Sequence, residues 1–113
     1  MTYRDDRSRL EDILGAIEAI ERYQSRGRVE CEQSELVRTW LVHHMQIIGE
    51  AASKVSNTLR EIHPEIPWRQ MAAMRHILVH DYFETSFEEI WQVVTRDLPV
   101  LKPIIRKIAS SLE

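Results

Sequence analysis

The sequence has few residues that interrupt helices, a single cysteine and no long apolar run. It contains three glycines, four prolines and one cysteine, Cys31, in 113 residues. One cysteine excludes an internal disulfide framework and a cysteine-rich zinc module, and we expect Cys31 to be an incidental loop residue. No apolar run reaches the roughly 18 residues that cross a bilayer, and the first six residues are too polar for a signal peptide. We therefore expect a cytoplasmic protein with no membrane partner.

The charge balance argues against proteins that coat nucleic acid. Eighteen acidic residues against fifteen basic ones leave a net charge of −3. Non-specific binding to nucleic acid needs a clear basic excess, although a small local phosphate site does not. No predicted helix is basic, so a helix-turn-helix DNA-binding protein fits poorly. With 43% hydrophobic and 29% charged residues, the chain is expected to fold as one domain over residues 1–113.

The apolar spacing predicts an all-α fold. The sequence has no Asn-Gly or Asp-Gly hairpin signal and no alternating strand-like segment, whereas apolar residues recur at helical spacing. We expect an up-and-down bundle of four to five helices. Their predicted ranges are 8–26, 34–59, 68–79, a fourth helix capped by Ser86, and a last one capped by Asp97 with a kink near Pro99–Pro103.

Within the first predicted helix, Asp6 or Ser8 is expected to cap the start, and Gly27 is expected to stop it. Gly15 weakens this helix, so we expect a close helix crossing there. The second predicted helix is apolar over more than one stripe, which indicates more than one neighbour. A second chain is one candidate for the extra neighbour. The small residues Gly49, Ala51, Ala52 and Ser53 would allow a close approach.

Reactive side chains are densest in residues 74–83, at the end of the third predicted helix. Arg75 offers a fork of donors that matches phosphate oxygens, and His80 can exchange a proton near neutral pH. Five residues apart, they lie about 140° from each other around a helix, so a symmetric dimer is the simplest way to gather such groups in one cleft. The alternatives are an arginine paired with a nearby acid and a histidine that only interacts with the helix dipole. His76 and His80 are spaced for a metal ion, but no third ligand accompanies them, so we expect no metal site.

Other candidate residues are expected to serve packing. We assign His43 and His44 to packing beside Trp40, and Trp68 and Trp91 to the core or an interface.

Four ordered segments carry a resemblance to a known family. They are Ile47-Ile48-Gly49-Glu50-Ala51-Ala52, His63-Pro64-Glu65-Ile66-Pro67-Trp68, Arg75-x4-His80-x-Tyr82 and Asp97-Leu98-Pro99. Over essentially the whole chain, the sequence resembles the HEPN superfamily, and more narrowly the HepT-type toxins of bacterial and archaeal toxin–antitoxin pairs.

This resemblance implies a homodimer in which two Arg-x4-His motifs line a cleft, and a metal-independent ribonuclease without a cofactor. Arg75 would hold the scissile phosphate of the RNA substrate and His80 would act as general acid or base. The RNA 2′-hydroxyl would attack phosphorus and leave a cyclic phosphate. His76 would either orient Arg75 or the phosphate, or cap a neighbouring group. Glu50 would either pair with Arg75 or remain an exposed acid.

The resemblance also implies a partner, a nucleotidyltransferase antitoxin of the MNT type that attaches AMP to Tyr82. A bulky anionic group there would block and neutralise a phosphate site beside Arg75. The alternative function is a non-catalytic interaction module of the same fold, whose cleft binds a nucleotide or the nucleotidyltransferase. The acidic net charge favours this alternative slightly.

Overall fold

The structure, a computed structural model, describes residues 2–80 and 87–112, with side chains over 6–75 and 87–112. Every regular element in these ranges is helical, so the all-α prediction is confirmed for the described residues. The elements are α1 Thr2–Gln24, α2 Arg28–Gln33, α3 Glu35–Ser53, α4 Asn57–Ile62, α5 Trp68–His80, α6 Phe87–Gln92, the π-helical segment η1 Val93–Asp97 and α7 Leu98–Ser111.

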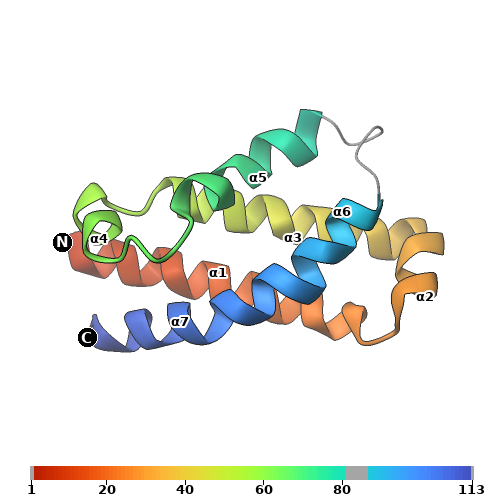
Figure 1. Cartoon of the computed structure of the whole chain (residues 1–113), viewed down its shortest axis with the longest axis horizontal. Helices are drawn as coiled ribbons and strands as arrows, with labels where there is room; N and C mark the ends of the chain where they lie inside the picture. Colours follow the sequence, from red (N-terminus) through yellow and green to blue (C-terminus); the bar gives the residue numbers. More distant parts are fainter. Residues whose placement is uncertain (1, 81–86, 113) are drawn as a thin grey trace.

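The long helices follow one another from top to bottom of Figure 1 in the order α5, α3, α1 and α7. α3 packs against both α1 and α5, and α1 also packs against α7. These intramolecular partners account for the wide apolar arc of α3. The predicted apolar stripe of α1 lies inside the core, where Leu10, Ile13 and Ile17 are fully buried, because residues three and four apart share one helix face.

Several local predictions for α1 are wrong. The helix begins at Thr2, so neither Asp6 nor Ser8 caps it. Asp6 is instead 2% exposed, and its carboxylate accepts hydrogen bonds from the backbone N–H and the hydroxyl of Ser56, at 2.8 and 2.6 Å. Gly15 is exposed, and a Cβ built on it would meet nothing within 4 Å. Among the described residues no helix crosses there, because Gly15 lies on the solvent side of the buried stripe.

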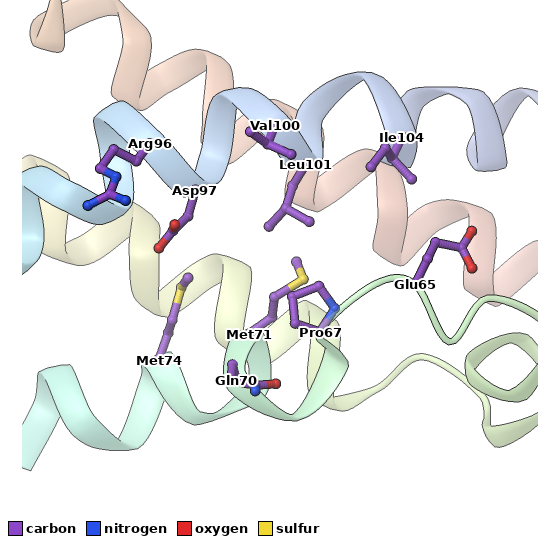
Figure 2. Close-up of a pocket in the computed structure, with 10 residues that line it drawn as sticks. All are labelled: Glu65, Pro67, Gln70, Met71, Met74, Arg96, Asp97, Val100, Leu101 and Ile104. Atoms are coloured by element: carbon purple, nitrogen blue, oxygen red, sulfur yellow. The ribbon is translucent and has the colours of Figure 1, made fainter.

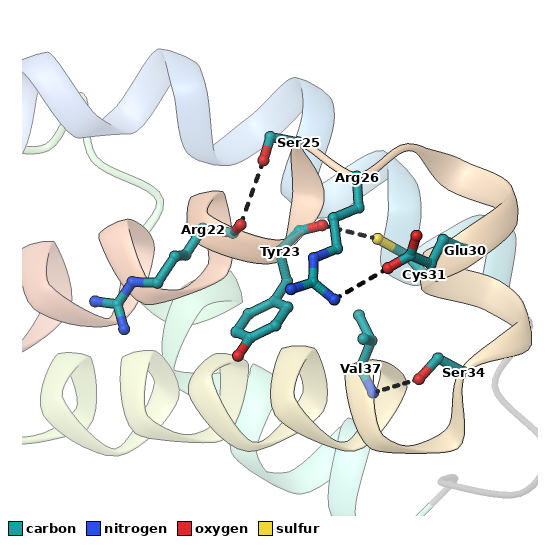
Figure 3. Close-up of polar contacts among 8 residues, drawn as sticks. All are labelled: Arg22, Tyr23, Ser25, Arg26, Glu30, Cys31, Ser34 and Val37. Carbon is teal, nitrogen blue, oxygen red and sulfur yellow. Dashed lines mark hydrogen bonds and ion pairs between the residues drawn. The ribbon is translucent and has the colours of Figure 1, made fainter.

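The segment predicted as one helix over 34–59 is two helices. Ser34 begins α3 as expected, and its hydroxyl accepts from the N–H of Val37 at 3.2 Å (Figure 3). α3 ends at Ser53, and Ser56 then caps α4 by accepting from the N–H of Leu59. The break follows from a long-range contact, since Asp6 binds the backbone N–H of Ser56.

Cys31 does not lie in a loop. It lies on α2, a short helix that the spacing did not predict, after Gly27 with its positive φ of 94°. Its side chain is fully buried, and the thiol donates to the carbonyl oxygen of Tyr23 at 3.2 Å (Figure 3). Burial, followed by the charge of Glu30, raises the pKa of this thiol.

The carboxyl-terminal segment runs through α6, η1 and α7 with helical backbone. Asp97 has helical dihedral angles and makes no capping hydrogen bond, so its predicted role as a cap is wrong. The irregularity before Pro99 is the π-helical turn of η1, and Pro103 lies inside α7. The proposed cap Ser86 lies outside the described residues.

Most of the predicted packing roles are confirmed. Trp68 is buried and its indole N–H donates to the carbonyl oxygen of His63 at 2.9 Å. The ring of His44 lies 4.3 Å from that of Trp40 between centroids, and its Nδ1 lies 2.8 Å from the Trp40 carbonyl oxygen. Trp91 stacks on Phe87. His43 differs, because it is exposed apart from an edge contact with His44. No helix in the described ranges is both long and apolar enough to span a membrane.

Candidate active site

The start of α5 is anchored by residues on its amino-terminal side. The carbonyl oxygen of Pro67 accepts from the N–H of Met71 at 3.0 Å, and proline at this point costs no helical hydrogen bond. Trp68 and Met71 are buried against the core. α5 then continues as one helix through His80, so Arg75 and His80 are both on α5.

Arg75 lies where the backbone of α5 approaches Gly49 of α3 closely. A Cβ built on Gly49 would lie 2.6 Å from the backbone nitrogen of Arg75 and 3.2 Å from its Cα. Only glycine leaves room for this approach. The close approach expected from the small residues of the second predicted helix is therefore present, at Gly49, and it fixes the backbone from which the Arg75 side chain extends.

The guanidinium of Arg75 binds Glu50 of α3. Arg75 Nη1 lies 2.6 Å from Glu50 Oε2, while the side chains remain 35% and 48% exposed. The other carboxylate oxygen, Glu50 Oε1, lies 3.1 Å from Lys54 Nζ. The hydrogen bond from Arg75, and then the one from Lys54, hold the pKa of Glu50 below its ordinary value. Both sequence alternatives for Glu50 therefore hold: it pairs with Arg75 and it is exposed.

The remaining predicted site residues are placed only in part. His80 is the last residue of α5 and His76 lies one turn earlier; the structure describes their backbone, not their side chains. Because α5 is regular, the separation of about 140° between Arg75 and His80 applies. Tyr82 lies outside the described residues. One α5 helix therefore does not present Arg75 and His80 on the same face.

The described part of the chain contains no group of three or more histidine, cysteine, aspartate or glutamate side chains spaced for a metal ion. It does contain a cluster in which the carboxylate of Glu50 binds both Arg75 and Lys54. Two cations on one carboxylate are suited to binding an anion.

A groove of about 420 Å³ runs beside the candidate site, between α5 and the wall made by η1 and α7 (Figure 2). Met71 and Met74 form its α5 side, and Leu101 faces them from α7. Arg96 and Asp97 lie at the end near Met74, the residue that precedes Arg75. Sequence reasoning did not identify this groove, because it depends on how two distant helices are spaced.

Lys54 is the site residue that sequence reasoning missed. The signal was present, since Glu50 and Lys54 are four residues apart on a predicted helix and such pairs are face neighbours.

Comparison with known proteins identifies relatives over nearly the whole chain. The family model described as HepT-like, Ribonuclease HepT-like, matches residues 13–108. "Probable ribonuclease HepT" of Thermococcus cleftensis is 37% identical, over 93% of this chain and 96% of that protein. "Putative RNase MJ1380" of Methanocaldococcus jannaschii is 34% identical, over 90% and 94%. "Putative RNase TTE0752" of Caldanaerobacter subterraneus subsp. tengcongensis is 31% identical, over 88% and 89%. No solved structure matches the chain.

Proposed function

The chain belongs to the HepT-like ribonuclease family, and from this premise we propose that it is an endoribonuclease that needs no metal ion. The observation that carries the proposal is the family match over residues 13–108, which spans Arg75 and His80. The exposed, carboxylate-bound guanidinium of Arg75 supports it, because a group that binds one oxyanion on the surface can bind another.

In the proposed reaction, Arg75 binds the non-bridging oxygens of the scissile phosphate and stabilises the charge that develops on them. His80 takes the proton from the RNA 2′-hydroxyl as that oxygen attacks phosphorus. The bond from phosphorus to the 5′-oxygen breaks, and that oxygen receives a proton from the protonated imidazole of a second copy of His80. The products are a 2′,3′-cyclic phosphate and a 5′-hydroxyl. Positioned proton transfer of this kind contributes typically about 10²–10⁴-fold.

The reaction as proposed takes place in a cleft between two identical subunits. The helical separation of Arg75 and His80 supports this proposal, because a second subunit could place its own groups beside the same phosphodiester. The two copies of His80 would divide the base and acid roles. Small-angle scattering tests the pairing, and a monomer at micromolar concentration would contradict it.

Ribonuclease activity is tested with purified protein and RNA in the presence of a chelator. His80→Ala is compared with the wild type, and His43→Ala serves as the matched control because His43 is an exposed histidine of α3 outside the proposed motif. We expect the wild type and His43→Ala to cleave equally, and His80→Ala to cleave about 10²-fold or more slowly. Equal RNA decay with the wild type and His80→Ala would remove the assignment. Retained RNA binding without cleavage in the wild type would favour the non-catalytic module.

We further propose that the protein is the toxin of a toxin–antitoxin pair. Its antitoxin would be an MNT-type nucleotidyltransferase that transfers AMP from ATP to the hydroxyl of Tyr82 and releases pyrophosphate. The added phosphate would repel RNA and occupy Arg75. Co-expression with the nucleotidyltransferase should add mass in AMP units to the wild type and none to Tyr82→Phe. An adduct on Tyr82→Phe would contradict the proposed position.

A further inference from the structure

Glu50 binds two cations, one on α5 and one at the carboxyl-terminal end of its own helix, α3. Its Oε2 lies 2.6 Å from Arg75 Nη1 of α5, and its Oε1 lies 3.1 Å from Nζ of Lys54, the residue that follows the end of α3. All three side chains are between one third and one half exposed. A protein carboxylate therefore occupies a position on Arg75 that an incoming phosphate would need.

We propose that Glu50 is an internal competitor of phosphate for Arg75, and that Lys54 is the residue that retains Glu50 when an RNA phosphate takes its place. This inference rests on the proposed function, since RNA is the ligand that displaces Glu50. In the free protein Glu50 is shared by Arg75 and Lys54. In the complex the phosphate binds Arg75 and the carboxylate remains on Lys54 alone.

The ion pair with Arg75 is suited to exchange because it is not needed to attach α5 to α3. The two helices are joined by the backbone contact at Gly49, and both contribute to one buried core, which includes Ile48 of α3 and Met71 of α5. An exposed ion pair adds little to stability, because water and salt screen it. A phosphate presents the same kind of paired oxygens to the guanidinium fork and can replace the carboxylate.

Lys54 is well placed to hold the released carboxylate. Glu50 precedes Lys54 by four residues, and Lys54 is the C-cap residue of α3 with helical dihedral angles, so the pair has the favourable helical order. Their separation is set by α3 and does not depend on α5.

Without a partner, the released carboxylate would repel the phosphate. The hydrogen bonds from Arg75 and then Lys54 keep the pKa of Glu50 low, so it is charged at neutral pH. A lysine that stays with Glu50 offsets this repulsion.

Five variants test the exchange: Glu50→Gln, Lys54→Gln, the double variant, Arg75→Ala, and Lys102→Gln as the matched control. Lys102 also binds a glutamate, with Nζ 2.7 Å from Glu21 Oε1, but it joins α7 to α1. The probe is a short RNA oligonucleotide with 2′-O-methyl groups, which binds but cannot be cleaved. Its Kd is measured by fluorescence anisotropy, and the Tm of each variant is measured alongside.

We expect Glu50→Gln to tighten binding about fivefold, the effect of removing one like charge at contact distance in water. Lys54→Gln should weaken binding about twofold, because Glu50 then has only Arg75 to bind. The double variant should match Glu50→Gln, and Lys102→Gln should match the wild type. Arg75→Ala should remove the differences between the variants.

The following results would overturn the exchange. If Lys54→Gln weakens binding of the oligonucleotide equally in the wild type and in Glu50→Gln, Lys54 contacts the phosphate itself. Weaker binding by Glu50→Gln would mean that Glu50 holds Arg75 in its binding position. Binding of the oligonucleotide that does not depend on Arg75 would remove the site altogether.

The readout separates this inference from the proposed function because it does not require cleavage. A wild type that fails to cleave RNA but shows the expected order of Kd values would support the exchange and contradict the ribonuclease. RNA cleavage with unchanged Kd values in Glu50→Gln and Lys54→Gln would contradict the exchange alone.

Discussion

Among the carboxylates that join distant parts of this chain, Asp6 and Glu50 lie in opposite surroundings. Asp6 binds Ser56, 50 residues away, and is 2% exposed. Glu50 binds Arg75, 25 residues away, with 48% of its side chain exposed. Both contacts are short and charge-assisted, so geometry alone does not separate them.

Exposure determines what each contact can do. A buried carboxylate whose partners are backbone and hydroxyl groups stabilises the fold, since removing it leaves buried groups without a partner. An exposed carboxylate on an arginine adds little stability, but it can be exchanged for another anion. The contact of Asp6 with Ser56 therefore stabilises the fold, whereas the contact of Glu50 with Arg75, between α3 and α5, can be exchanged for an anionic ligand.

The largest expected effect breaks the buried contact. Asp6→Ala should lower the free energy of unfolding by about 3 kcal/mol, because the N–H and hydroxyl of Ser56 lose a charged acceptor. Asp12→Ala, at an exposed position on the same helix, is the control and should leave stability unchanged. Urea unfolding followed by circular dichroism measures both. Equal stability of the two variants would contradict the structural role of Asp6.

The next effect concerns the close approach of α3 and α5. Gly49→Ala should cost about 2 kcal/mol, because its methyl group would press on the backbone of Arg75, which cannot move aside cheaply. Gly15→Ala, at a helical position with open space, should instead stabilise the protein by about 1 kcal/mol. Thermal unfolding compares the two. A Gly49→Ala variant as stable as the wild type would mean that the helices are not in contact there.

A third test sharpens the comparison by pH. The pKa of Glu50 is lowered from 4.5 in the fold, so its ion pair contributes above that ordinary value and is lost as pH falls through the lower folded pKa. Its charge is then constant between about pH 5 and pH 9. If the pH profile of kcat/KM of the wild type has an inflection near neutrality, Glu50→Gln should show the same inflection, because we expect it to report His80. Loss of the inflection in this variant would assign it to Glu50.

The smallest effect concerns Cys31. Because burial raises its pKa, iodoacetamide at pH 8 should modify the native protein slowly and the urea-unfolded protein rapidly. Mass spectrometry at timed intervals measures both rates. Equal rates would show that the α2 contact with Tyr23 does not protect the thiol.

The sequence predicted elements well where the signal was local. The stripe of α1, the cap at Ser34 and the start of α5 after Pro67 follow from periodicity and capping. Several of the predictions that failed depended on distant partners, whereas the cap at Asp97 failed because the backbone there continues as a helix. Gly15 and Gly49 look alike in sequence, yet only Gly49 meets another helix. The break after Ser53 depends on Asp6, and the burial of Cys31 depends on α2 folding back on Tyr23. For the candidate site, the motif with Arg75 and His80 was visible, and the role of Lys54 was not.

By itself, the sequence determined that the chain is helical, which faces are apolar, and that Arg75 and His80 are about 140° apart if one helix carries both. These properties follow from the helical repeat, which can be recognised in any short segment of the sequence. Only the tertiary structure decided that Glu50 binds Arg75 at an exposed position while Asp6 binds Ser56 at a buried one. Whether a charged group is buried or exposed depends on how whole helices pack, and no local pattern contains that information.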